Sequence, residues 1–394
     1  MIFWLVGCDP YADWPEAGTY FPWVYTPETE LEPYESVRWE TETWSPEDDA
    51  DQLALYLLKA QNHKPRGVTE VEQHFSAQAL PAAGDGLTLS LAGDVMRVGD
   101  NWSSFATPAA ELLDGDLRVG NLETPVSALH STEPGDLGLY AFNAPESMLD
   151  ALPFDALQLN NNHSLDAGDE GLAATVEAVG QGYVATGIDG HATVDDIALL
   201  SYTWGTNVRE PSVHELFIEP FGHADPDIDW DRVAADLSVD ARWKVVLVHW
   251  GYEYEYFPEP QFMVQAREFI RLGADLVVGQ GPHVVQPAEL CHLNDPSQVP
   301  GVGTCSVRTD DGEARTAAVI YSLGNFATNM ATIPCQVGIV GTVTLGDDGV
   351  TGLGWEALAT VDGPEVVPLD SLDAAEYLAE GERLEGHLAG WGRR

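Results

Sequence analysis

From Leu87 onward, the sequence alternates short apolar runs of strand length with amphipathic stretches of helical period. This alternation is typical of an α/β domain, in which helices cover a largely parallel sheet. Strands are predicted at 87–92, 117–120, 156–159, 197–203, 245–248, 276–278 and 317–321. Helices are predicted at 170–179, 261–272 and 374–388, and short strands separated by turns such as 346–349 are expected after Val337.

Five of the predicted strands lead into a chemically active side chain at the carboxyl end. These side chains are Asp94, Glu123, the pair Asn162 and His163, His249, and His283. Open α/β sheets place their ligand crevice at this edge. Carboxylates, an Asn carbonyl and imidazoles suit a divalent ion such as Mn, Zn or Fe, which lowers the pKa of bound water to about 7. We therefore predict a hydrolytic metal centre, with His163 as the general acid toward a leaving group.

Each of these residues also has a simpler explanation when it is taken alone. Asp94 could cap a turn, Asn162 could occupy a left-handed turn position, and His249 could be a hydrogen-bonded core histidine. Their recurrence at equivalent strand ends favours a common site. Two further residues stay open: Asp166 could be a helix cap or a site residue, and Glu253 could contact substrate or face solvent.

The net charge of −47 comes from 64 acidic against 17 basic side chains. Such a surface repels phosphate backbones and anionic headgroups, so nucleic-acid partners are excluded and membrane contact is expected only through a lipid anchor. The hydrophobic content of 44% is sufficient for a buried core, and no apolar run is long enough to span a membrane. The charge suits a protein exposed to salt outside the cytoplasm, and equally an ordinary acidic secreted protein.

The first residues contain Leu5-Val6-Gly7-Cys8, which has the form of a bacterial lipobox whose cysteine is lipidated. Only seven residues precede Cys8 and none is basic, so the alternative is a short buried strand with a chance cysteine. The lipobox interpretation predicts an extracytoplasmic protein of the cell envelope, anchored through Cys8.

The domain organisation follows from shifts in composition. Residues 1–8 are interpreted as the remnant of a lipoprotein signal, and 9–86 as an acidic arm rich in Pro and aromatic residues, with a short helix at 52–64 and a linker at 81–86. Residues 87–345 form the main domain, and 346–394 are predicted to pack on it as strands and a helix.

Cys291 and Cys305 flank a polar loop rich in Gly and Pro. In an oxidising compartment they could form a disulfide, and the alternative is two inert thiols. Cys335 would be left unpaired.

Six ordered segments lie between residue 87 and about residue 330. They are Gly93-Asp94-Val95-Met96, Asn121-Leu122-Glu123-Thr124-Pro125, Asn161-Asn162-His163-Ser164-Leu165-Asp166-Ala167-Gly168, His249-Trp250-Gly251-Tyr252-Glu253-Tyr254, the stretch from Gly273 to Gly279 with Pro282-His283, and Tyr321-Ser322-Leu323-Gly324-Asn325-Phe326. In this order they resemble the bacterial capsule-synthesis protein family CapA, associated with poly-γ-glutamate biosynthesis and related to calcineurin-like metallophosphoesterases.

The resemblance implies a four-layer αββα sandwich of the metallophosphatase type and a location in the cell envelope. Carried over by position, the metal ligands are Asp94, the bridging carboxylate Glu123, Asn162, His249 and His283, and the acid is His163. Glu253 and Asn325 are expected to bind substrate.

Two positions depart from the wider phosphoesterase pattern. Met96 stands where an Asp-x-His motif has its histidine, and Gly281 stands where relatives commonly carry a further histidine. Each metal would then keep about three protein ligands, so the sequence leaves one or two ions open.

The resulting hypothesis is a metal-dependent hydrolase or transferase acting on an anionic polymer or peptide-type substrate, within a membrane-bound capsule synthesis complex. A second hypothesis keeps the site without a metal, as a peptide epimerase that uses His and carboxylate acid–base chemistry. A third is a non-catalytic subunit that binds or exports the polymer.

Overall fold

The computed structural model describes residue 11 and residues 69–78, 80–81, 84–98, 106–138, 141–207, 228–258, 260–362, 365–388 and 390–393. Cys8, most of the predicted arm and the helix predicted at 52–64 lie outside these residues. Within them, no helix is both long enough and apolar enough to span a membrane.

The strands of the described residues form one large sheet. Hydrogen bonds link its strands in the order β4-β3-β2-β1-β13-β14-β11-β8-β7-β6-β5. In chain order the strands are β1 Leu87–Val95, β2 Leu117–Leu122, β3 Ala156–Gln158, β4 Val184–Thr186, β5 Ala192–Val194, β6 Ile197–Thr203, β7 Trp243–His249, β8 Leu276–Gln280, β9 Val285–Leu293, β10 Cys305–Val307, β11 Arg315–Leu323, β12 Asn325–Ala327, β13 Val337–Gly346, β14 Gly349–Val361, β15 Glu365–Pro368 and β16 Gly392–Arg393.

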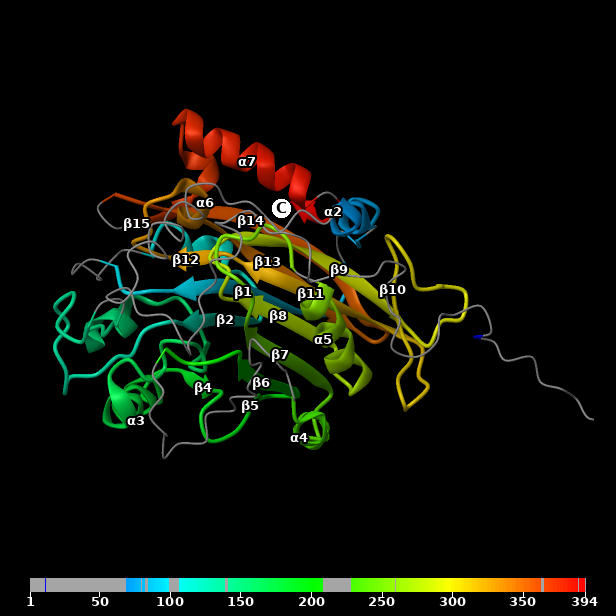
Figure 1. Cartoon of the computed structure of the whole chain (residues 1–394), viewed down its shortest axis with the longest axis horizontal. Helices are drawn as coiled ribbons and strands as arrows, with labels where there is room; N and C mark the ends of the chain where they lie inside the picture. The colour runs from blue at the N-terminus through cyan, green and yellow to red at the C-terminus, as the bar shows by residue number, and fades with distance from the viewer. Residues whose placement is uncertain are drawn as a thin grey trace, which may run out of the picture.

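The α-helices of the described residues are short relative to the sheet. They are α2 Thr69–Ser76, α3 Gly168–Val179, α4 Trp230–Asp236, α5 Pro260–Arg271, α6 Ile333–Gln336 and α7 Ala375–His387. Figure 1 shows α7 along one side of the molecule, near β14, and α3 and α4 near β4 and β5 on the other side. The mixed α/β fold predicted from the sequence is therefore confirmed.

The sheet folds back on itself around a shared core. β11 and β14 are joined only through the pair Thr316 and Gly349, so the strands on either side of this junction diverge. One apolar cluster contains residues from β1 and β2 together with residues from β6, β7 and β8, and it also includes Leu384 of α7 and Leu388 directly after that helix. A second cluster packs α4 and α5 against β6 to β8, and a third covers the outer side of β1 to β3.

The predicted strands and helices of the main domain are all present, and the turn at 346–349 joins β13 to β14. Some elements differ from the prediction for identifiable reasons. The strands after Val337 are long, with 10 and 13 residues, because they pair with each other along almost their whole length. The buried strand β9 was missed because Pro287 interrupts its pattern, and α2 was missed because it is only 8 residues long.

A disulfide joins Cys291 of β9 to Cys305 of β10, as the spacing allowed. The two residues are directly opposite each other in the parallel pairing of these strands. Cys335 is buried and unpaired, and burial raises the pKa of its thiol to about 12.

Candidate functional site

The polar residues at the strand ends meet in one buried cluster. Asp94 of β1 is opposite Asn121 of β2 in the parallel register, and His249 at the end of β7 is opposite Gln280 of β8. Glu123 follows β2 directly, and His283 is the third residue after the end of β8. The fold thus brings together residues that lie almost two hundred positions apart in the chain.

Asp94, Glu123 and His283 form the centre of the cluster. Each offers one ligand atom, and these atoms lie within 4.8 Å of one another. His283 Nδ1 is 3.2 Å from Asp94 Oδ2 and 3.8 Å from Glu123 Oε2. On the other side of Glu123, Oε1 is 3.5 Å from His249 Nε2 and 4.0 Å from His163 Nε2.

Glu123 is the least satisfied residue of the cluster. Its side chain is 0% exposed, and neither carboxylate oxygen has a hydrogen-bond partner among the described residues. Burial, together with the neighbouring charge of Asp94, raises its pKa to about 8. Burying an ionised carboxylate without a hydrogen bond costs free energy unless a nearby cation offsets its charge.

His283 supplies one such positive charge. Burial alone would lower its pKa, but the charge of Glu123 and the hydrogen bond and charge of Asp94 raise it to about 10. Burial would raise the pKa of Asp94, yet the hydrogen bond and charge of His283 hold that pKa below its usual value. His283 has a left-handed backbone with φ 59°, a conformation that is uncommon for non-glycine residues and recurs at functional sites.

His249 has a different environment. Its Nδ1 is 3.2 Å from the amide nitrogen of Asn121, which also donates to Asp94 Oδ1 at 2.7 Å. Burial lowers the pKa of His249 to about 3, so its imidazole is neutral at ordinary pH.

His163 is oriented by two neighbours. Its Nδ1 is 2.6 Å from Asp166 Oδ2, and the ring of Phe142 lies 4.6 Å from the imidazole centroid. Burial acts to lower the pKa of His163, but the charge and hydrogen bond of Asp166 raise it above its usual value. Asp166 also accepts the backbone N–H of Phe142. Because the carboxylate of Asp166 contacts the imidazole predicted to be the acid, this contact favours the site-residue interpretation of Asp166 over the helix-cap interpretation.

The other predicted site residues lie around this centre. Asn162 has a buried Oδ1 without a hydrogen-bond partner among the described residues. Asn325 is fully buried and its Oδ1 is 3.0 Å from His283 Nδ1. Glu253 is half-buried, and burial raises its pKa. Substrate contacts of Asn325 and Glu253 stay predictions.

Asn121 and Asn161 were not predicted as site residues. Asn161 donates to Asn121 Oδ1 at 3.1 Å and to the carbonyl of Leu122 at 2.9 Å. The signal was present in the sequence, because Asn121 begins the same motif as Glu123 and Asn161 precedes Asn162. Their amide contacts, however, depend on the tertiary structure.

Met96 and Gly281, the two positions that depart from the phosphoesterase pattern, are closely surrounded by neighbouring residues. Met96 is buried, and its sulfur accepts the hydroxyl of Thr328 at 3.3 Å. Gly281 has φ +107°, and a Cβ added there would lie 2.7 Å from the carbonyl oxygen of Trp250 and 3.1 Å from His249 Nε2. A histidine at position 281 would therefore require this part of the site to rearrange.

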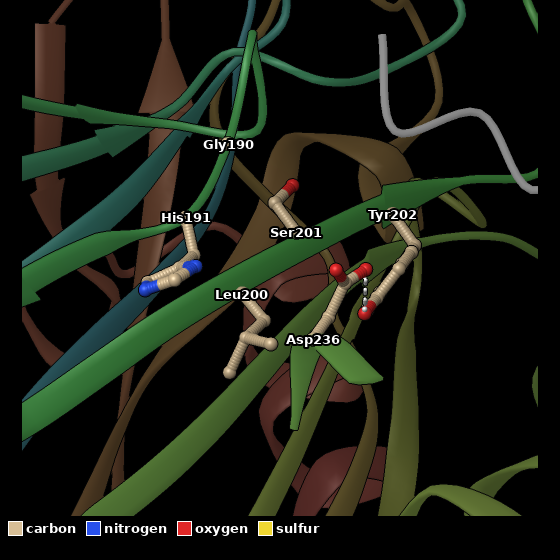
Figure 2. A pocket seen from close by; sticks show the side chains of 6 residues that line it. All are labelled: Gly190, His191, Leu200, Ser201, Tyr202 and Asp236. Atoms are coloured by element: carbon tan, nitrogen blue, oxygen red, sulfur yellow. Dashed lines mark hydrogen bonds between the residues drawn. The ribbon is translucent and has the colours of Figure 1, made fainter. Parts of the chain in front are cut away.

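A small pocket elsewhere on the molecule also contains Ser, His and Asp side chains. Figure 2 shows Tyr202 and Asp236 facing each other, with their hydrogen bond of 3.2 Å, while His191 lies apart from that pair. The buried hydroxyl of Ser201 has no hydrogen-bond partner among the described residues. Because no Ser–His hydrogen bond is present among the residues lining it, this pocket lacks an activated nucleophile.

The cluster at the strand ends fits a divalent cation. The two oxygens of Glu123 need positive charge, and carboxylate, imidazole and Asn carbonyl donors match the preferences of Mn, Zn and Fe. A possible metal-binding group is therefore present in the described residues, and the identity of the ion stays a prediction.

The residues of the cluster all lie within a match to a known protein family. The family described as "Bacterial capsule synthesis protein PGA_cap" matches residues 79–330, which is more than half of the chain and includes every residue of the cluster. The chain belongs to this family. The CapA resemblance stated from the sequence motifs is thereby confirmed.

Two curated relatives of this PGA_cap member carry the name CapA. The chain is 26% identical over 267 residues to "PGA biosynthesis protein CapA" of Bacillus subtilis, covering 61% of this chain and 63% of that protein. It is 25% identical over 270 residues to "Capsule biosynthesis protein CapA" of Bacillus anthracis, covering 61% and 59%. The chain thus spans about six tenths of the length of these relatives.

A hypothetical protein from Thermus thermophilus is a weaker structural neighbour. It is 13% identical with a TM-score of 0.40, over 69% of this chain and 98% of that one. This likeness is too low to carry an argument.

Proposed function

We propose that this member of the PGA_cap family acts in the biosynthesis or processing of a capsule or poly-γ-glutamate polymer, through metal-assisted hydrolysis or transfer. The observation that carries the proposal is Glu123, a fully buried carboxylate whose two oxygens have no hydrogen-bond partner in the described part of the chain and face three histidines. Family membership supplies the polymer context.

The finer fold proposal is a four-layer αββα sandwich of the metallophosphatase type. It is supported by the shared cluster between the two groups of strands and by separate outer clusters under α3 and α5. Such a sandwich places strand ends from both halves at one edge, where the cluster is found.

Asp94, Glu123 and His283 would hold the ion, with Asn162 Oδ1 as a further candidate ligand. The ion would polarise a phosphoryl or carbonyl oxygen and activate water. His163 then protonates the leaving group from Nε2, because its Nδ1 is occupied by Asp166. Phe142, packed against the imidazole, limits the rotation of the ring.

The charge of the chain is relevant to an anionic substrate. With 64 acidic side chains and only 17 basic ones, the surface repels a polyanion. A bound cation supplies the local positive charge that such a substrate needs. The proposed location is the cell envelope, with Cys8 as the lipid anchor; a Cys8→Ser variant made with an extended start should no longer partition with membranes, and unchanged partitioning would overturn the anchor.

Metal analysis of the purified protein tests the proposal. We expect stoichiometric Mn, Zn or Fe in the wild type and its loss in Asp94→Asn and His283→Ala variants. The matched control is Asp155→Asn, which changes a carboxylate paired with Arg118 away from the cluster. Metal content that is absent from the wild type, or unaffected in both site variants, would contradict the metal centre.

A second function is favoured by the protonation of His283. Its imidazolium lies between Asp94 and Glu123 and balances part of their charge without a metal. The cluster would then perform proton abstraction and return, as in a peptide epimerase. Exchange of a substrate Cα–H for deuterium in metal-free protein would support this function, and its absence would contradict it.

If aryl phosphate, phosphodiester and γ-glutamyl substrates all stay uncleaved with every metal tried, and no deuterium exchange occurs, a non-catalytic polymer-binding or export subunit becomes the better assignment.

A further inference from the structure

Tyr11 is held at the ends of two neighbouring strands. Its hydroxyl donates to the carbonyl oxygen of Asn294 at 3.0 Å, and the guanidinium carbon of Arg308 lies 4.3 Å from the centroid of its ring. A cation at this distance is attracted by the face of an aromatic ring. Asn294 directly follows β9 and Arg308 directly follows β10. Tyr11 therefore contacts both strands at their carboxyl ends.

The acceptor of this hydrogen bond is fixed relative to the sheet. The side-chain amide of Asn294 donates to Thr309 Oγ1 at 2.6 Å and to the carbonyl of Glu313 at 2.8 Å. Its Oδ1 accepts the backbone N–H of Thr309 at 3.0 Å. Asn294 is buried, and it joins the turn after β9 to the turn after β10. The contact with Tyr11 is thus made on a well-connected part of the fold.

This contact lies at the edge of the sheet opposite the strand-end cluster. β9 is antiparallel to β11, so Leu293 at the end of β9 pairs with Arg315 at the start of β11. Two residues beyond the other end of β11, Asn325 contacts His283 of the cluster at 3.0 Å. β11 has 9 residues, which span about 30 Å. Figure 1 labels β10 near one end of the molecule and β12, which begins with Asn325, toward the other.

The loop between β9 and β10 exposes apolar side chains at the same edge as Tyr11. Two of the five exposed large apolar side chains in the described residues are on this loop, Val299 at 43% and Val302 at 45% exposure. The loop is held against α2, because the N–H of Gly303 donates to His74 Nδ1 at 3.0 Å. Covering these valines with an apolar partner would be favourable.

The position of Cys8 in the sequence indicates which partner covers them. Cys8 precedes Tyr11 by three residues, and three residues span at most about 11 Å. A lipid on Cys8 would therefore enter a bilayer close to the contact between Tyr11 and Asn294. The loop with Val299 and Val302 starts at that same asparagine. The acidic surface disfavours anionic headgroups, so the matching partner is a zwitterionic lipid surface.

We propose that the protein stands on the lipid bilayer with the β9–β10 loop against the membrane and with the strand-end cluster facing away from it. The proposal rests on the lipid anchor proposed at Cys8 and deepens the function proposed for the cluster. With the cluster about 30 Å from the bilayer surface, its substrate is a segment of a water-soluble polymer, and groups attached to a membrane lipid are out of reach.

Leu129 provides a matched position on the side of the cluster. It is an exposed apolar residue like Val299, with 68% exposure. Its backbone N–H donates to Ser127 Oγ at 3.2 Å, and the N–H of Ser127 donates to the side chain of Asn143. Asn143 is next to Phe142, whose ring packs against His163 of the cluster.

Fluorescence quenching by lipids tests the orientation. Val299→Cys and Leu129→Cys are labelled with a fluorophore in the lipidated full chain, made with an extended start and placed in phosphatidylcholine vesicles that contain nitroxide-labelled lipid. The native thiols of the described residues do not compete for the label, because Cys291 and Cys305 form a disulfide and Cys335 is buried. We expect a loss of fluorescence at position 299 and none at position 129.

Equal quenching at the two positions, or quenching at position 129 alone, would overturn the orientation while the lipid anchor stands. Mass spectrometry of the membrane fraction that finds no lipid on Cys8 would overturn the anchor and the orientation together. Neither result changes the metal content, so failure of the metal centre is recognised separately. A fluorescence change at position 299 that depends on protein concentration without vesicles would assign the valines to a second copy of the chain and overturn the membrane contact.

The role of Tyr11 is tested by two variants. Tyr11→Ala removes the ring under Arg308 and the hydrogen bond to Asn294, so the difference in quenching between positions 299 and 129 should become smaller. Tyr11→Phe keeps the ring and should stay closer to the wild type. A folded Tyr11→Ala protein with the wild-type difference would show that Tyr11 does not set the orientation.

Discussion

Two buried clusters of charged residues in this protein contain a glutamate with the same burial and opposite chemistry. The core network consists of His74, Arg267, Glu289 and Tyr321, which come from α2, α5, β9 and β11. The site cluster contains Glu123 at the strand ends. Both glutamates are 0% exposed.

The difference lies in their partners. Glu289 is 2.8 Å from Arg267 and 2.8 Å from His74, and it also accepts the hydroxyl of Tyr321. Although burial acts to raise its pKa, the charge of Arg267 and these hydrogen bonds lower it to about 2. Glu123 has no hydrogen-bond partner among the described residues, and burial raises its pKa to about 8. A satisfied buried carboxylate stabilises the fold, whereas an unsatisfied one marks a place where a ligand belongs.

The largest expected effect is the loss of one partner in the core network. Arg267→Met leaves Glu289 with its main positive partner removed, so the free energy of unfolding should fall by about 3 to 5 kcal/mol. Urea denaturation followed by fluorescence measures this change. Glu268→Gln, which alters the neighbouring and more exposed pair with Arg271, is the control and should cost less than about 1 kcal/mol. Equal losses in the two variants would contradict the distinction between core and surface pairs.

The second-largest expected effect is a loss of protein stability in acid, through protonation of Glu289 in the core network. The pKa of Glu289 is 4.5 in a model peptide and about 2 in the folded protein, so the native state binds this proton more weakly. The resulting stabilisation is about 3 kcal/mol, present above pH 4.5 and lost as the pH falls toward 2. Comparing stability against pH for wild type and Glu289→Gln measures it. A variant that loses as much stability as the wild type over this interval would show that Glu289 is not responsible.

The third-largest expected effect is a loss of activity when His163 is no longer oriented by Asp166. Asp166→Asn removes the carboxylate from His163 Nδ1, and we expect kcat to fall about a hundredfold, or about 2.7 kcal/mol, with little change in KM. The measurement uses whichever aryl phosphate, phosphodiester or γ-glutamyl substrate the wild type cleaves. Partial recovery in Asp166→Glu would support positioning, and an Asp166→Asn enzyme as active as the exposed control Glu170→Gln would exclude it.

The smallest expected effect is a change in stability at Glu123 that is opposite in sign to the change expected at Glu289 of the core network. Glu123→Gln removes a buried carboxyl group whose pKa rises from 4.5 to about 8 on folding. Folding near pH 7 then no longer requires proton uptake at this position, so the metal-free protein should become more stable by about 1 kcal/mol while its metal binding is lost. The corresponding Glu289→Gln change should destabilise. Thermal unfolding of the metal-free proteins compares the two, and destabilisation by both variants would mean that Glu123 is satisfied after all.

Much of the site could be predicted because it is encoded locally. Asp94, Glu123, His249 and His283 each follow an apolar run that forms a strand, and parallel strands place their carboxyl ends at a common edge. The contacts that orient them could not be predicted in the same way. Asn121 contacts His249 from 128 positions away in the chain, and Asn325 contacts His283 from 42 positions away. No local pattern distinguishes such an asparagine from one in a turn.

The sequence by itself determined the α/β pattern, the family and the residues that assemble at the strand ends, because apolar periodicity and short motifs depend on neighbours in the chain. Only the tertiary structure decided that Glu123 is left without a hydrogen-bond partner among the described residues while Glu289 is fully paired. It also placed His249 beside the amide nitrogen of Asn121 and His283 beside the amide oxygen of Asn325. Protonation and hydrogen-bond direction depend on distances of about 3 Å between distant segments, and those distances exist only after the chain has folded.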